Sequence, residues 1–203
     1  MNKKYVFKKV KEALDMDNPL WEKVNVTHID CYDFCEVNDY PRTTVQGVYS
    51  DKGISLLYKT DEKEVLARYT KLGDPAYKDS CVEFFFNPCP DINNNYFNFE
   101  VGAGGGMKLG FGPGRGNRPQ PENAKLELFN VQTRIDEDGW QACFFIPFSF
   151  VLENCPEFAK NFKGNFQKCG DETACEHYPT WNKINVPKPD FHRPEFFGDM
   201  ILE

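Results

Sequence analysis

Apolar and polar residues alternate over much of the chain. The segment 79–88 (DSCVEFFFNP) places Val82, Phe84 and Phe86 on one face of an extended strand and Glu83 on the other. The segment 95–101 (NYFNFEV) alternates rings with polar residues in the same way. A period of two is the period of a β-strand, so both segments are predicted to be strands.

Turn residues join further strand-like segments into hairpins. Asp51-Lys52-Gly53 separates 43–50 from 54–60, and the turn 136–139 (DEDG) separates 125–135 from 139–147. Such turns between alternating segments are typical of β-hairpins. Weaker strand patterns cover 164–169 and 197–203, a short helix is predicted over 148–162, and 62–69 is ambiguous.

Many short strands with Gly, Asn and Asp turns predict an all-β fold, an antiparallel β-sandwich or jelly roll. The 203 residues contain no repeat and no long polar linker, so residues 1–203 are predicted to form a single domain. The glycine-rich segment Gly102–Arg118 is expected to be a long mobile loop, with Arg115 and Arg118 at the rim of a site. It lacks the features of a phosphate-binding loop.

Composition limits the kinds of molecule that the protein is expected to bind and the compartment in which it is expected to work. The net charge is −7 and the pI about 5.1, which argues against binding of nucleic acid or an anionic membrane. The basic N-terminus precedes no apolar run of signal-peptide length, so a cytoplasmic location is expected. The eight cysteines are irregularly spaced, and free thiols are expected in a reducing compartment.

Metal and nucleophile motifs are weak. Cys169, Cys175 and His177 lack the close cysteine spacing that structural zinc prefers, and the sequence has no EF-hand pattern or Gly-x-Ser-x-Gly motif. His192 is expected to stabilise a turn. No catalytic residue is assigned, and metal ligands are left unknown.

Carboxylates and rings offer another chemistry. Glu83 lies mid-strand on the face opposite the apolar residues, where a carboxylate faces either solvent or a ligand. A glycosidase needs two carboxylates across a sugar bond, and spacing alone does not pair Glu83 with Glu100 or Glu195. Flat rings cover the apolar face of a pyranose, and the loop 177–183 (HYPTWNK) supplies Tyr178 and Trp181. Core packing of Trp181 is an equally good interpretation from composition.

Four segments carry a family resemblance: 17–24 with Trp21, the strand 79–88, 164–184, and the ending 187–203 (PKPDFHRPEFFGDMILE). Together they resemble carbohydrate-binding module family 9 and related domains. The resemblance implies a β-sandwich that holds a sugar between two aromatic rings. By position, the resemblance assigns the ring nearer the C-terminus to Trp181 and the ring nearer the N-terminus to Tyr77. It assigns a carboxylate that binds sugar hydroxyls to Glu83. Asn98 and Lys168 match positions that make further polar contacts with the sugar. Family members also carry structural calcium, for which no ligands are indicated here.

Three functions therefore stay open. The first is non-catalytic binding of a mono- or oligosaccharide of glucan or xylan type, linked to carbohydrate catabolism, with Trp181 as the main docking ring. The second is a glycan-processing enzyme or subunit that uses Glu83 as an acid or base. The third is an intracellular interaction domain that kept the sandwich without a ligand. The ending 187–198 is predicted to be a strap whose prolines keep it extended.

Overall fold

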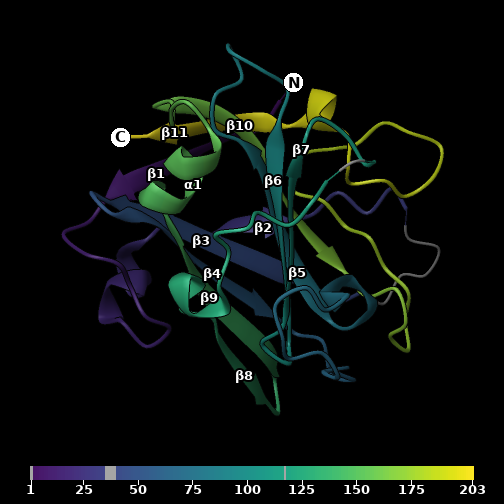
Figure 1. The fold of residues 1–203 in the computed structure, drawn as a ribbon. Helices are drawn as coiled ribbons and strands as arrows, with labels where there is room; N and C mark the ends of the chain where they lie inside the picture. The colour runs from purple at the N-terminus through teal and green to yellow at the C-terminus, as the bar shows by residue number, and fades with distance from the viewer. Residues whose placement is uncertain (1, 35–39, 117) are drawn as a thin grey trace.

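The strands form one strongly curled sheet in a computed structural model that describes residues 2–34, 40–116 and 118–203 (Figure 1). The strand order is β7-β6-β5-β10-β11-β1-β3-β4-β9-β8, with β2 beside β3. The strands are β1 (Lys4–Lys9), β2 (Thr27–Ile29), β3 (Thr43–Ser50), β4 (Gly53–Thr60), β5 (Cys81–Asn87), β6 (Tyr96–Gly102), β7 (Met107–Gly112), β8 (Gln132–Asp136), β9 (Gly139–Pro147), β10 (Asn161–Cys169) and β11 (Gly198–Leu202). The predicted all-β sandwich is confirmed.

Strand β1 turns the sheet from one layer of the sandwich to the other. Its first residues pair with β11, where Tyr5 lies opposite Met200, and its last pair with β3, where Lys8 lies opposite Val48. Both pairings are parallel, whereas every other pair of neighbouring strands in the described chain is antiparallel. The expectation of an antiparallel sandwich therefore holds except at this corner.

Aromatic side chains fill the space between the layers. Val82, Phe84 and Phe86 of β5 are completely buried in the main core, as their alternation predicts. The Phe166 ring of β10 lies 4.9 Å from Phe84 and 6.2 Å from Tyr58 of β4, between ring centroids. Aromatic pairs at such distances add stability beyond the area they bury. The opposite, outer face of β5 is therefore free to carry polar residues.

The predicted hairpins and helix form with altered bounds. The hairpins β3–β4 and β8–β9 are present, but residues Leu126–Phe129 form the 3-10 helix η3 before β8. Helix α1 covers only Phe148–Asn154, because Pro156 follows and 161–169 continue as β10. Further 3-10 turns are η1 (Pro19–Lys23), η2 (Ala76–Lys78) and η4 (Pro194–Phe196). The ambiguous segment 62–69 is irregular.

The glycine-rich segment is not one long loop. Met107–Gly112 form strand β7, which pairs with β6 from Met107 to Gly112. After Gly112 the chain leaves the sheet, and residues 113–116 and 118 belong to the loop that follows β7. The loops after β10 and before η4, in yellow-green and yellow, lie on the opposite side of β5–β7 from α1 (Figure 1). These loops enclose the outer face of the sheet.

The described helices include none that is long and apolar enough to cross a membrane.

Candidate functional site

Strand pairing gathers polar residues on the outer face of β5, β6 and β10. Glu83 lies directly opposite Gln167 of β10 on one side and Glu100 of β6 on the other. Directly opposite residues of antiparallel strands project from the same face of a sheet. Glu100 in turn lies opposite Lys108 of β7. The outer face therefore carries a row of polar side chains across four strands.

A cavity of about 610 Å³ opens over this row. Its size falls in the range of small-molecule sites, which is roughly 300–1,000 Å³. The strands supply its floor, and the turn η2, the loop after β7, the loop after β10 and the C-terminal strap (187–198) supply its walls. The lining residues are Tyr77, Glu83, Phe85, Asn98, Glu100, Lys108, Gly110, Arg115, Arg118, Cys169, Asp171, Glu176, Tyr178, Lys188, Pro189, Asp190, Phe191 and His192.

Glu83 is a buried acid at the floor, with only 2% of its surface exposed. Its Oε1 accepts a hydrogen bond from the Cys169 thiol at 2.9 Å, and its Oε2 has no partner in the described protein. Burial, with the neighbouring Cys169 and Glu100, raises the pKa of Glu83 well above its ordinary value. The surroundings of Glu83 therefore favour its protonated form more than water does.

Glu100 shares the floor with Glu83 and is equally enclosed. Its Oε1 accepts from the Asn98 amide at 2.7 Å, whereas its Oε2 has no partner in the described protein. Burial raises the pKa of Glu100 to about 7, although the Asn98 hydrogen bond and the charge of Lys108 act in the opposite direction. Its charge therefore changes near neutral pH.

Arg118 positions Asn98. Its Nε and Nη2 donate to the Asn98 Oδ1 at 3.0 and 2.6 Å, and its guanidinium carbon lies 3.8 Å from the centroid of the Tyr96 ring. A Cβ at Gly110 would lie 2.8 Å from the same Oδ1, so this close approach requires glycine. Since Asn98 already binds Arg118 and Glu100, its amide orients Glu100 and has little capacity left for a ligand.

Rings form the upper walls of the cavity. Tyr77 and Tyr178 are half-buried, and Phe191 of the strap lies 6.1 Å from Tyr178 between ring centroids. Tyr178 donates its hydroxyl hydrogen to Glu176 Oε1 at 2.8 Å. Rings from segments far apart in the sequence therefore line the same cavity as the two carboxylates.

The strap is anchored over the floor by His192. Its Nδ1 shares a hydrogen bond with the Tyr96 hydroxyl at 3.0 Å, and its ring lies 5.0 Å from that of Phe85. Burial, together with Arg118, lowers the pKa of His192 to about 4, so the imidazole is neutral. Arg115 closes the outer edge through an ion pair of 3.1 Å with Asp190.

Comparison with known proteins places this architecture in a family. The model of carbohydrate-binding family 9 matches residues 9–202, which is nearly the whole chain. The chain belongs to carbohydrate-binding family 9. No curated protein matches the sequence.

Solved structures share the family fold. A putative carbohydrate-binding protein from Bacteroides uniformis superposes with a TM-score of 0.87 at 24% identity, over 100% of both chains. A family 9 module from Caldicellulosiruptor kristjanssonii, solved with glucose, has a TM-score of 0.72 at 11% identity and covers 99% of this chain and 96% of its own. A structure of a family 9 module from the same organism with cellotriose has a TM-score of 0.70 at 11% identity, with 99% and 94% covered.

The ring that the family resemblance favours is not in the cavity. Trp181 is only 1% exposed and packs in the main core, 5.5 Å from Phe166 between ring centroids. Its Nε1 donates to the Thr27 hydroxyl at 2.9 Å, and a Cβ at Gly198 would lie 2.5 Å from its ring. The prediction that Trp181 is an exposed docking ring is therefore wrong, and Tyr178, three residues earlier, faces the cavity instead.

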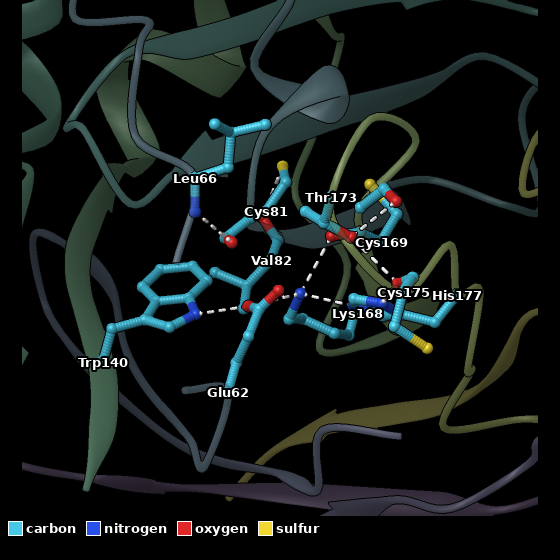
Figure 2. A network of polar contacts seen from close by, with 12 residues as sticks. Glu62, Leu66, Cys81, Val82, Trp140, Lys168, Cys169, Thr173, Cys175 and His177 are labelled. Atoms are coloured by element: carbon cyan, nitrogen blue, oxygen red, sulfur yellow. Dashed lines mark hydrogen bonds and ion pairs between the residues drawn. The ribbon is translucent and has the colours of Figure 1, made fainter. Parts of the chain in front are cut away.

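Lys168 is also placed elsewhere. It is completely buried on the inner side of β10, where its Nζ lies 3.0 Å from Glu62 Oε2 and 2.6 Å from His177 Nε2 (Figure 2). Trp140 Nε1 donates to the same Glu62 oxygen at 2.8 Å. The prediction that Lys168 contacts a sugar is wrong, because alternation along β10 turns Gln167 outward and Lys168 inward.

The fixed contacts of His177 define its tautomer. Its Nδ1 lies 2.5 Å from the Cys175 carbonyl oxygen, which can only accept a hydrogen bond. Nδ1 therefore carries the hydrogen, and Nε2 accepts one from the Lys168 ammonium. Burial and the charge of Lys168 lower the pKa of His177 to about 4, which keeps the ring neutral. His177 is thus part of a core network and does not serve the cavity.

Of the six predicted sugar-binding residues, the structure brings four to one cavity: Tyr77, Glu83, Asn98 and Tyr178. Their contact with sugar stays a prediction. Sequence reasoning did not pair Glu83 with Glu100, because the register of β5 and β6 depends on the intervening loop. Lys108 was missed for a different reason: its segment was expected to be a loop but forms strand β7.

Candidate metal ligands gather at the same floor. Within the described residues, the group of three or more His, Cys, Asp or Glu side chains that could hold an ion is Cys81, Glu83 and Cys169. Ca²⁺ is bound by oxygen ligands, and two of these three donors are sulfur. The cluster therefore does not fit the structural calcium that the family resemblance implies.

Proposed function

We propose that the cavity binds a neutral sugar, a single unit or the end of a short glucan- or xylan-type oligosaccharide, and does not convert it. The membership of carbohydrate-binding family 9 supports this proposal. The glucose and cellotriose held by the two family 9 modules indicate which sugars to test first.

One observation carries the proposal. Glu83 Oε2 and Glu100 Oε2 are both buried, line one cavity and lack a hydrogen-bond partner in the described protein. Leaving a buried polar atom unpaired costs about 1–3 kcal/mol. Sugar hydroxyls can supply the missing partners, since each hydroxyl both donates and accepts.

The rings complete such a site. Tyr77 and Tyr178 line the same cavity as the two carboxylates, and an aromatic face can cover the apolar C–H face of a pyranose. In this proposal Tyr178 takes the part that the sequence resemblance assigns to Trp181. Arg118 and Asn98 then act as positioning residues, since they hold Glu100 in place.

Binding without catalysis fits the placement of the two acids. Glu83 and Glu100 project side by side from one sheet face. A glycosidase places its two carboxyl groups on either side of the bond that is cut. The link to carbohydrate catabolism and the cytoplasmic location stay predictions from the sequence.

Titration calorimetry with glucose, xylose, cellobiose and xylobiose tests the proposal. At least one sugar should give saturable heat, and Glu100→Gln should weaken its affinity roughly 10- to 100-fold, since a hydrogen bond to a charged group contributes about 1.5–3 kcal/mol. Glu195→Gln is the matched control, because Glu195 is an exposed carboxylate of the strap outside the cavity. Absence of heat with all four sugars, or equal losses in both variants, would contradict the proposal.

A further inference from the structure

Two thiols accompany the acid at the floor of the cavity. Cys81 of β5 lies directly opposite Cys169 of β10, and Glu83 follows Cys81 by two residues on the same strand. Residues two apart on a strand share a face, so all three side chains project together. Their two Sγ atoms and a Glu83 carboxylate oxygen lie within 4.8 Å of one another.

The backbone holds these three groups in place. β5 and β10 are adjacent strands inside the sheet, paired without interruption from Cys81 to Asn87. The Cys169 thiol is already 2.9 Å from Glu83 Oε1, and all three residues are at least 98% buried. Little conformational freedom is left to lose when a ligand bridges them.

We propose that Cys81, Cys169 and Glu83 bind one thiophilic divalent metal ion, for which Zn²⁺ is the best match. Two sulfur donors and one carboxylate oxygen are ligands that Zn²⁺ accepts in tetrahedral sites. Three protein ligands leave a fourth position, and Glu83 and Cys169 both line the cavity. The fourth ligand is then water or a molecule bound in the cavity.

The surroundings favour a cation. Glu83 Oε2 has no partner in the described protein although the residue is only 2% exposed, so one carboxyl oxygen is available to a ligand. Glu100 lies directly opposite Glu83 on β6, and Asp171 lies close enough to act on Glu83 electrostatically. The cavity itself provides the path by which an ion reaches Cys169 and Glu83.

Co²⁺ is a suitable probe, because its thiolate complexes absorb strongly. The full-length protein, reduced with a phosphine and free of sugar, should bind one Co²⁺ per chain and show a thiolate-to-cobalt charge-transfer band that added Zn²⁺ abolishes. Cys81→Ser and Cys169→Ser should each weaken binding by at least about 100-fold, more than the roughly 10- to 100-fold that loss of an outer-shell partner costs. Glu83→Gln should weaken binding but keep the thiolate band.

Cys155→Ser is the matched control. Cys155 is a second buried thiol that shares a hydrogen bond with another cysteine, Cys89. This variant should bind Co²⁺ as the wild type does, and so should a background with Cys31, Cys35 and Cys175 replaced by Ser. Loss of the band in either control, its persistence in Cys169→Ser, or no band in the wild type would overturn the proposal.

Two measurements keep the test decisive. Thermal unfolding identifies any variant that fails to fold, and Glu83→Gln then tests the site with both thiols present. Sugar titrations in a chelator, without metal, test the proposed sugar binding separately. Failure of metal binding would leave sugar binding standing, and failure of sugar binding would leave the metal site standing.

Discussion

Two buried carboxylates of this protein lie on opposite faces of the same sheet and behave in opposite ways. Burial alone would raise the pKa of Glu62, but Lys168 and the Trp140 indole bring it below its ordinary value. Burial raises the pKa of Glu83 well above its ordinary value, and the neighbouring Cys169 and Glu100 raise it further. The surroundings of Glu62 therefore favour its charged form, whereas those of Glu83 favour its neutral form.

The difference shows how a structural polar group differs from one available to a ligand. Glu62 Oε2 binds both Lys168 and Trp140, so the network in Figure 2 is internally satisfied. Glu83 Oε2 and Glu100 Oε2 have no partner in the described protein. Networks of the first kind stabilise a unique packing, whereas unpaired groups cost stability and persist where a ligand uses them.

The largest expected effect comes from breaking the satisfied network. Lys168→Met should lower the free energy of unfolding by about 3–5 kcal/mol, because it leaves Glu62 as an uncompensated buried charge. Denaturant unfolding followed by circular dichroism measures the change. Lys163→Met is the control, since its ion pair with Asp199 is partly exposed and contributes at most about 1 kcal/mol. Comparable losses in both variants would remove the distinction between the two regions.

Trp181→Ala should also destabilise the fold, by roughly 3–5 kcal/mol, because it empties a core site beside Phe166. Sugar affinity of the folded protein should stay unchanged, because Trp181 is outside the cavity. Calorimetry below the unfolding temperature, beside Trp181→Phe as a milder replacement, measures both quantities. Selective loss of sugar binding without destabilisation would restore Trp181 as a docking ring.

Glu100, at the cavity floor, should make the free energy of unfolding depend on pH. The pKa of Glu100 is 4.5 in the unfolded reference and about 7 in the folded protein, so the folded state holds its proton more firmly. Its contribution to stability is present below pH 4.5 and is lost as the pH rises through about 7, by up to ~1.4 kcal/mol per pH unit. As the pH rises through this range, the wild type should lose stability relative to Glu100→Gln. The difference between the thermal unfolding midpoints of the two proteins should therefore grow with pH. If the midpoints of the two proteins changed with pH in parallel, the pKa of Glu100 would not be raised by folding.

Smaller effects are expected from the cavity walls. Tyr178→Ala and Tyr77→Ala should each weaken sugar affinity by roughly 2- to 13-fold, since an aromatic contact contributes about 0.5–1.5 kcal/mol beyond area burial. Tyr178→Phe keeps the ring and should retain most of the affinity, although it loses the bond to Glu176. Titration of the three variants with the best sugar of the panel measures the effect, and full affinity in both alanine variants would exclude stacking.

The sequence by itself determined most of the strands, the two tight hairpins and the outward face of Glu83, but not β1, β2 or β7. Alternation with period two sorts residues between two faces of a strand, and that sorting is local. It also contained the family signature, from which the fold follows. The sequence alone did not predict which aromatic side chains the folded sheet buries.

Only the tertiary structure decided that Trp181 packs inside while Tyr178 faces the cavity, because neither residue lies in a strand whose alternation could be read. It also decided the neighbours of each polar group. Glu83 meets Glu100 through the register of β5 with β6, across the loop 88–95, and Cys169 through the register of β5 with β10, which is distant in sequence. Such registers depend on the packing of the whole sandwich, so local patterns do not specify them.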